Sequence, residues 1–280
     1  MSLYFDNLVI IFLLVLVESI PFWLIYNWSK TLNFAQITCF GIAGYSYTIL
    51  STRTNLNIWI AIALSIFFGT LANLIVYFIS RINQKLDIAT FSFILCVFFY
   101  FISVNTVTLT NGNLGLINIP PLPFNIFCVL IIILVIEFAV IISLIRSQLG
   151  LVSQNLKDTK LLENLGINWE FSRLIIFLVS GVFASIAGIL SASYWHYIDP
   201  KILNYSFIFT LLAITILTKQ NISRIFIYCS LVTLIPELLR VFNLSILSSS
   251  EIKNIVFDII ILLAILTSKL KFNSNYVTKN

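Results

Sequence analysis

Long stretches without a charged side chain constrain the fold of this chain more than any other feature. Four of them, each free of Asp, Glu, Lys and Arg, span residues 31–52, 54–80, 88–136 and 174–198. A helix needs about 20 apolar residues to cross roughly 30 Å of hydrocarbon, whereas a transmembrane barrel is built from alternating strands of about ten residues. Only 10% of the 280 residues are charged, against about a quarter in soluble domains. The sequence therefore predicts an all-α, polytopic bundle of transmembrane helices.

The borders of the apolar blocks give the expected helices. The stretch 88–136 is too long for one span, and a turn-rich segment divides it. That segment contains Asn111, Gly112, Pro120, Pro121 and Pro123. We expect about nine spans, with eight to ten as the range, at residues 5–26, 32–50, 56–80, 88–108, 124–145, 171–195, 203–218, 224–242 and 252–268. The first block has no basic residue before its apolar core, which predicts a membrane span and not a cleavable signal.

The basic residues predict the orientation of these spans. With nine spans, twelve of the 16 Lys and Arg residues fall in one set of connections, and four fall in the other set: Arg53, Lys201, Arg240 and Lys253. Because basic residues gather on the cytoplasmic side, the amino terminus is expected outside and the carboxyl terminus in the cytoplasm. Topology accounts for the net charge of +5, so the charge implies no nucleic-acid partner.

The chain lacks the residue patterns of common catalytic, metal and cofactor sites. Its four cysteines occur singly inside apolar blocks, where a thiol behaves as a small hydrophobe: Cys39, Cys96, Cys128 and Cys229. His196 is the single histidine, and the sequence contains no phosphate-binding Gly-x-x-x-x-Gly-Lys-Ser/Thr loop and no aspartate-rich pair for Mg²⁺-diphosphate. We therefore expect no catalytic site, no metal site and no cofactor.

Acidic residues inside the expected spans are candidates for function because charges in hydrocarbon are costly. Glu18, Glu137 and Asp258 fall within spans, and Glu237 and Arg240 are three residues apart on one helix, where they can pair. An ion-coupled transporter could use Glu137 or Asp258. The simpler hypothesis is structural, with Ser, Asn or water in the bundle satisfying the carboxyl groups.

The longest hydrophilic segment, residues 146–170, is expected on the cytoplasmic side. We expect a short amphipathic helix outside the membrane, with Asp158 as its N-cap and Gly166 as a left-handed residue that ends it. Leu161, Leu162 and Leu165 form an apolar stripe on it. This helix either rests on the bilayer or docks a cytoplasmic partner, and its mixed charge favours a protein over anionic lipid.

Most of the nine glycines occur in pairs. These pairs are Gly41 and Gly44, Gly112 and Gly115, Gly150 and Gly166, and Gly181 and Gly188. Glycine alone allows both a close approach of two helices and a turn with positive φ at little cost. The pairs within spans are thus candidates either for the transport path or for helix packing.

The same segments resemble a known family. Gly150–Asn168, with the sequence GLVSQNLKDTKLLENLGIN, is similar to the "GRALRAIRENExAAxxLGIN" stretch in the cytoplasmic loop of branched-chain amino acid ABC importer permeases. Other segments, before and after this one, are also similar to family motifs and occur in the family's order: Leu32–Gln36, Phe40–Tyr45, Thr110–Gly115, Phe177–Leu190, Ile198–Pro200 and Pro236–Arg240. Together they cover nearly the whole chain, which resembles the membrane-spanning permease subunit of these importers.

Two segments depart from the family pattern. Thr218–Ser223 stands in place of a glycine-rich "GGxGS" turn, and Asn111 replaces a glycine of the 110–115 loop. Relatives in the family carry urea or short amides, so the expected solute is a branched-chain amino acid or a similar small polar molecule.

The resemblance implies an importer of two permease chains, two cytoplasmic ATPases and an external solute-binding protein in a bacterial inner membrane. Residues 1–280 are one permease domain, in which residues 146–170 form the coupling loop. Its expected ATPase contacts are Gly150, Lys157, Asp158, Leu161, Leu162, Glu163, Leu165 and Gly166. The expected path or packing residues are Gln36, Gly41, Gly44, Tyr45, Thr110, Gly112, Gly115, Gly181 and Gly188.

The chain itself is then not an enzyme, since ATP hydrolysis belongs to a partner chain. Two other functions remain open at the level of sequence. One is a sugar or nucleoside permease of an ABC importer, and the other is an ion-coupled secondary transporter that uses Glu137 or Asp258. A membrane scaffold without transport activity is a further alternative.

Overall fold

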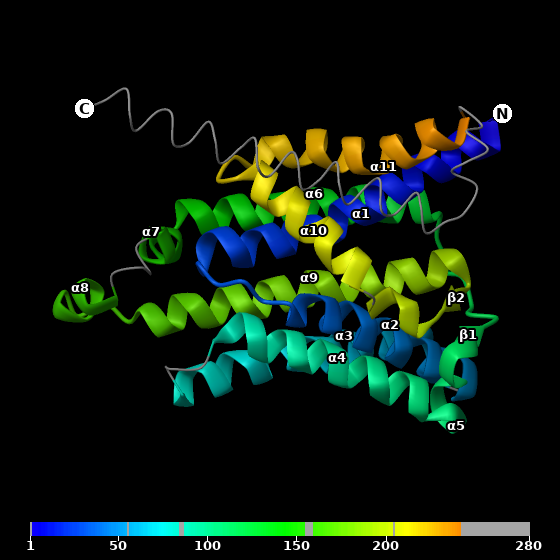
Figure 1. Ribbon diagram of the computed structural model, residues 1–280, viewed down its shortest axis with the longest axis horizontal. Coiled ribbons are helices and arrows are strands. Elements are labelled where there is room, and N and C mark those ends of the chain that lie inside the picture. The colour runs from blue at the N-terminus through cyan, green and yellow to red at the C-terminus, as the bar shows by residue number, and fades with distance from the viewer. Residues whose placement is uncertain (1, 55, 84–86, 155–158, 204, 242–280) are drawn as a thin grey trace.

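The structure is a computed structural model (Figure 1), and it describes residues 2–241 except 55, 84–86, 155–158 and 204. For residues 2, 3, 154, 159–161, 205, 206 and 235–241 it describes the backbone alone. The ninth expected span at 252–268, with Asp258, lies outside the described residues, and so do the side chains of Glu237 and Arg240.

Eight long helices coincide with the first eight expected spans. They are α1 (Ser2–Trp28), α2 (Ala35–Arg53), α3 (Ile58–Ile82), α4 (Ile88–Asn105), α6 (Ile126–Arg146), α9 (Trp169–Trp195), α10 (Tyr205–Thr218) and α11 (Ile225–Val241). Five of them, α1, α3, α4, α6 and α9, are long and apolar enough to cross a membrane. The predicted helical fold is therefore confirmed, whereas the number of nine spans stays a prediction.

Side-chain caps explain where several helices begin. Asn57, Asp87, Asn125 and Asn168 each accept a hydrogen bond from a backbone N–H in the first turn of α3, α4, α6 and α9, respectively. The hydroxyl and backbone N–H of Thr90 hold the pKa of the Asp87 carboxyl below its ordinary value. Such caps satisfy N–H groups that have no partner within the helix.

The expected helix at 88–108 is shorter than predicted. α4 ends at Asn105 because Thr106 leaves the helical conformation with ψ 62°, and a separate turn, α5 (Val107–Thr110), follows it. A 3-10 turn, η1 (Gly112–Leu114), leads to strand β1 (Leu116–Ile117). β1 pairs antiparallel with β2 (Tyr197–Ile198), which places Leu116 opposite Ile198. This ribbon is an exception to the all-α prediction.

α9 lies at the centre of the bundle. In Figure 1, α1, α6 and α11 lie on one side of α9, and α2, α3 and α4 lie on the other. α9 packs directly against α1, α2, α3 and α6. The short helices α7 (Gln148–Gln154) and α8 (Thr159–Asn164) project from one end, whereas α5, β1 and β2 lie at the opposite end.

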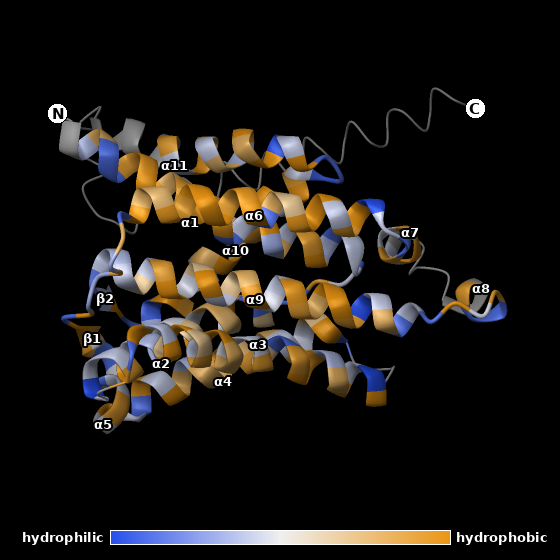
Figure 2. Ribbon diagram, turned by 180° about the vertical axis from the view of Figure 1, so that it is seen from behind, coloured by the Kyte–Doolittle hydropathy of each residue, from blue (hydrophilic) through white to orange (hydrophobic). Residues whose placement is uncertain are grey.

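The surface of the bundle is strongly apolar. Figure 2 shows hydrophobic residues along the outer faces of α3, α4 and α6. On α4, for example, Ile94, Phe98 and Phe101 are more than half exposed, at 57%, 60% and 56%. A soluble protein rarely exposes an apolar surface of this extent, so these faces are suited to lipid or to another membrane subunit.

Candidate coupling loop and transport sites

The segment after α6 forms two short helices and not the one that the sequence predicts. α7 begins two residues after α6 ends, and a Cβ atom at Gly150 would collide with the backbone oxygens of Leu144 and Ile145. Glycine is therefore required where α7 folds back against the end of α6. Lys157 and Asp158 lie outside the described residues, so the N-cap expected at Asp158 stays a prediction.

Gly166 ends α8 in the left-handed conformation that the sequence predicts. Its φ is +70°. Its N–H donates to the carbonyl of Glu163 at 2.9 Å, and the N–H of Ile167 donates to the carbonyl of Leu162 at 3.0 Å. These two bonds form a Schellman motif, which satisfies the last carbonyls of the helix. The expected conformation of Gly166 is confirmed.

The expected leucine stripe on α8 is only partly available to a partner. Leu165 is 65% exposed, but Leu162 is 4% exposed and is covered by the chain itself. The side chain of Leu161 lies outside the described residues. In the chain by itself α8 turns Leu162 inward, and the predicted contact of Leu162 with a partner stays a prediction.

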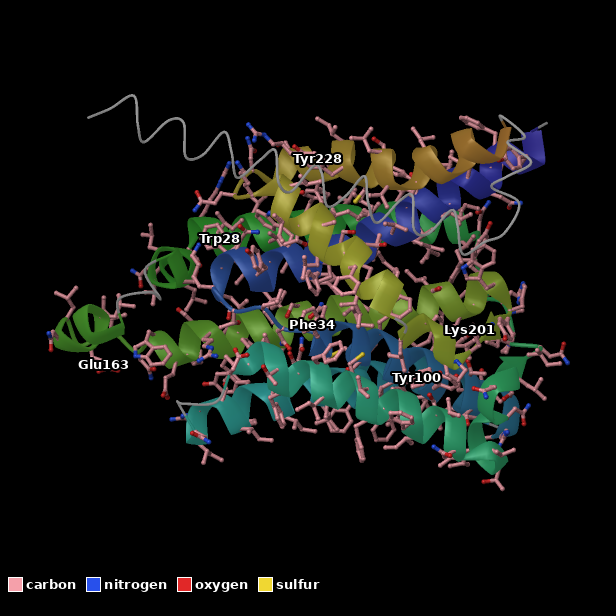
Figure 3. All side chains as sticks on the ribbon, in the orientation of Figure 1. Trp28, Phe34, Tyr100, Glu163, Lys201 and Tyr228 are labelled. Atoms are coloured by element: carbon pink, nitrogen blue, oxygen red, sulfur yellow. The ribbon has the colours of Figure 1, made fainter. Side chains whose placement is uncertain are left out.

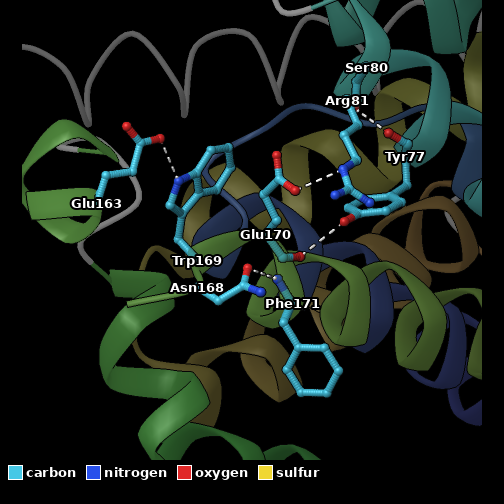
Figure 4. Close-up of polar contacts among 8 residues, drawn as sticks. All are labelled: Tyr77, Ser80, Arg81, Glu163, Asn168, Trp169, Glu170 and Phe171. Carbon is cyan, nitrogen blue, oxygen red and sulfur yellow. Dashed lines mark hydrogen bonds and ion pairs between the residues drawn. The ribbon is translucent and has the colours of Figure 1, made fainter. Parts of the chain in front are cut away.

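Polar contacts tie α8 to the first turn of α9 and that turn to the end of α3 (Figure 4). The indole Nε1 of Trp169 donates to Glu163 at 3.0 Å. The Glu170 carboxylate is 2.7 Å from Nε of Arg81, and its backbone carbonyl accepts a hydrogen bond from the Tyr77 hydroxyl at 3.1 Å. These contacts connect α8 with α9, and α9 with α3.

Glycines allow α2, α3 and α9 to approach closely. A Cβ atom at Gly188 would collide with the carbonyl of Phe40, and one at Gly44 would lie 3.2 Å from the carbonyl oxygen of Gly188. Gly181 lies against Asn73. Gly41, Gly44, Gly181 and Gly188 are thus found in helix packing, and the transport path proposed for them stays untested.

A buried polar cluster joins the same three helices at Gln36. Its Nε2 donates to the carbonyl of Ser180 at 2.7 Å, and its Oε1 accepts from Nδ2 of Asn73 at 2.9 Å. Nδ2 of Asn33 donates to Oδ1 of Asn73 at 3.1 Å. Sequence reasoning missed Asn73, although an amide in the middle of the charge-free stretch 54–80 was a signal for it.

The loop that carries Thr110, Gly112 and Gly115 closes the other end of the bundle. Thr110 donates to the carbonyl of Ser103 at 2.6 Å, and Gly112 and Gly115 have φ values of +59° and +70°. A Cβ atom at Gly115 would collide with the carbonyl of Ile198. Tyr45 packs in the same apolar cluster as Ile198. The expected residues of this loop therefore meet the residues that follow α9.

Most of the chain matches a known family of transport proteins. The profile described as "Branched-chain amino acid transport system / permease component" matches residues 4–265. The chain belongs to this family. No curated protein and no solved structure gives a comparable match. The family description confirms the resemblance found in the sequence and makes this chain a multi-pass membrane component of a transport system.

Each of the two segments that depart from the permease family's glycine pattern contains a residue with a left-handed backbone. Asn111 has a φ of +57°, and Lys219 has a φ of +54°. Asn tolerates this region well because its short side chain can bond locally. At Lys219 the carbonyl oxygen accepts a hydrogen bond of 2.5 Å from the indole of Trp23. Both turns therefore contain a left-handed residue that is not glycine.

The acidic residues of the permease core do not have the expected polar partners. Glu18 on α1 and Glu137 on α6 are both 0% exposed. Among the described residues, none makes a hydrogen bond to either carboxyl group. α1 and α6 pack against each other. The described Ser and Asn side chains therefore do not hydrogen-bond these two carboxyl groups, contrary to the structural hypothesis.

Proposed function

We propose that this chain is the membrane-spanning permease subunit of an ABC importer. Its solute is a branched-chain amino acid or a similar small polar molecule. Membership of the permease family over residues 4–265 carries this proposal. The sequence holds no phosphate-binding loop, so the energy of ATP hydrolysis must come from a separate ATPase subunit.

The coupling loop at 146–170 supports an ATPase partner. Leu165 presents an apolar side chain that is 65% exposed. Glu163 and Glu170 link this segment to α9 and α3. ATPase closure would move α8 as a rigid unit, and these contacts would carry the motion into the bundle. Lys157, Asp158 and Leu161 are further proposed contacts of the ATPase.

The proposed topology follows from the distribution of basic residues. We assign about nine spans, an outer amino terminus and a cytoplasmic carboxyl terminus, with α7 and α8 inside the cell. The proposed setting is a bacterial inner membrane. A second, related permease chain and an external solute-binding protein complete the importer, and residues 1–280 act as a single permease domain.

The energy source of uptake tests the proposal. The purified chain should show no ATPase activity, and reconstituted uptake should require a separate ATPase and ATP. Uptake should continue when proton and sodium ionophores collapse the ion gradients. Loss of uptake under ionophores, with ATP still present, would overturn the ABC assignment.

One observation favours a second candidate, an ion-coupled secondary transporter. At Glu18 and Glu137, two fully buried carboxyl groups that have no hydrogen-bond donor among the described residues are suited to taking up a proton. Asp258, proposed for the same role, lies outside the described residues. The ionophore experiment separates this candidate from the ABC importer.

A further inference from the structure

A cavity of about 350 Å³ lies between α1, α2, α9 and α10. Most of its wall is apolar and includes Leu14, Phe40 and Phe207. This volume falls within the range of about 300–1,000 Å³ that is typical of small-molecule sites. No coupling residue with a described side chain lines the cavity.

Two opposite charges stand in the wall of this cavity. Asp199 and Lys201 belong to the segment that connects β2 with α10, where η2 spans Pro200–Leu203. Figure 3 shows Lys201 toward the opposite end of the bundle from Glu163, so the cavity belongs to the half away from the coupling loop. In the proposed topology this is the outer half, which a solute reaches first.

The two charged groups are available to a ligand. Asp199 and Lys201 are both described, and no ion pair joins them in the structure. The Asp199 carboxylate accepts a hydrogen bond from the Tyr197 hydroxyl at 3.3 Å. Burial and this neighbouring carboxylate raise the pKa of the Tyr197 hydroxyl. A carboxylate and an ammonium group that do not pair with each other, in one apolar cavity, match a ligand that carries both charges.

We propose that this cavity binds a zwitterionic α-amino acid with an aliphatic side chain. The ammonium group of the ligand faces Asp199, its carboxylate faces Lys201, and its side chain lies among Leu14, Phe40 and Phe207. The inference rests on the proposed importer function and assigns a first solute site within the permease itself. A sugar or a nucleoside would leave one or both charges of the cavity without a counterpart.

Protection of an introduced cysteine tests the site in the full-length chain, purified with its co-purifying subunits in nanodiscs. Cys128 is an exposed native cysteine, so Cys128→Ala provides the background. Trp195→Cys and Ser191→Cys place a thiol on the cavity wall. Leu114→Cys is the matched control, because Leu114 is 81% exposed near the same end but does not line the cavity.

L-Leucine at about ten times its Kd should slow maleimide labelling of the two cavity cysteines about tenfold, in proportion to occupancy. Labelling of Leu114→Cys should not change. The analogue without the ammonium group, 4-methylpentanoate, and the analogue without the carboxylate, 3-methylbutylamine, should protect only at much higher concentrations. Ribose should not protect.

Charge variants test the two polar contacts. Asp199→Asn should weaken protection by L-leucine about tenfold to a hundredfold, as expected for a lost hydrogen bond between charged groups, and should leave protection by 4-methylpentanoate unchanged. In Lys201→Gln, protection by 4-methylpentanoate should weaken, whereas protection by 3-methylbutylamine should not change. Arg53→Gln is the control, since Arg53 donates to the carbonyl of Thr108 and does not line the cavity.

Several results would overturn the site. Equal protection by L-leucine and both analogues would indicate an apolar or lipid cavity, and protection by ribose would indicate a neutral solute. ATP-driven leucine uptake without protection would place the solute elsewhere while leaving the importer function intact. A different result, uptake that requires no ATP, would refute the proposed importer function.

Discussion

Replacement of Gly166 measures how strongly the coupling loop depends on one backbone conformation. A Cβ atom at this position would meet no other atom within 4 Å, so substitution costs no packing. The cost is the strain of holding an L-residue at φ +70°, which is about 1–2 kcal/mol for a residue with a Cβ atom. Gly166→Val should lie at the upper end of that range. Gly166→Asn should lie well below it, because Asn tolerates this conformation.

Amide hydrogen exchange reports this strain directly. The N–H groups of Gly166 and Ile167 close the Schellman motif at the end of α8. If these amides exchange through local opening of α8, a strain of 1 kcal/mol speeds their exchange about fivefold, and a strain of 2 kcal/mol speeds it about thirtyfold. In the Val variant, co-purification of the ATPase should fall in parallel, whereas membrane insertion and abundance should stay near normal.

The Asn variant is the matched control for this experiment. It removes the glycine but keeps the left-handed turn, so exchange and ATPase binding should stay close to those of the parent chain. Equal behaviour of the Val and Asn variants would refute the argument from backbone strain. Normal ATPase binding in the Val variant, with α8 measurably opened, would show that α8 does not dock the ATPase.

Three further predictions address the bundle. Asn73→Leu removes the hydrogen bonds to Gln36 and Asn33 and should cost about 1–3 kcal/mol, seen as a lower thermal midpoint in detergent. Lys219→Gly relieves the strain of φ +54° and should raise the thermal midpoint by an amount equivalent to about 1 kcal/mol. Glu18→Gln and Glu137→Gln should keep transport within about tenfold of the parent rate if neither acid carries a proton during transport.

Each of these has its own control or contrary result. Asn105→Leu changes an exposed amide on α4 and should alter stability by less than about 0.5 kcal/mol. A lower thermal midpoint for Lys219→Gly would show that the lysine side chain stabilises the protein by more than its backbone strain costs. A rate loss greater than about tenfold in either Gln variant, at normal membrane levels, would support proton uptake by that acid.

The sequence predicts the long helices well because the cost of charge in hydrocarbon is a local property of each segment. Residues such as Asn57, Asn125 and Asn168 also cap the helices that follow them, so both composition and capping point to the same borders. Gly166 is predictable for a similar reason. Its role depends on its own φ angle and on the two backbone N–H groups, of Gly166 and Ile167, that donate hydrogen bonds to carbonyls of the last turn of α8.

Features that depend on distant segments were not predictable in the same way. The inward position of Leu162 depends on how α8 turns against the rest of the chain. Strands β1 and β2 pair residues about 80 positions apart, such as Leu116 and Ile198. The cavity with Asp199 and Lys201 arises only when four helices meet. One sequence contains no signal that fixes these contacts.

The buried amide cluster can form completely only after α9 has been synthesised. Asn73 contacts Ser180, which lies 107 residues later in the chain. At about 5–20 residues per second, translation needs roughly 5–20 s to deliver α9 after α3. Until then, the amides of Gln36 and Asn73 lack their partners on α9 in a lipid environment that offers no hydrogen bonds. Completion of this bundle therefore waits for α9, and a leucine at position 73 would ease early insertion while weakening the finished protein.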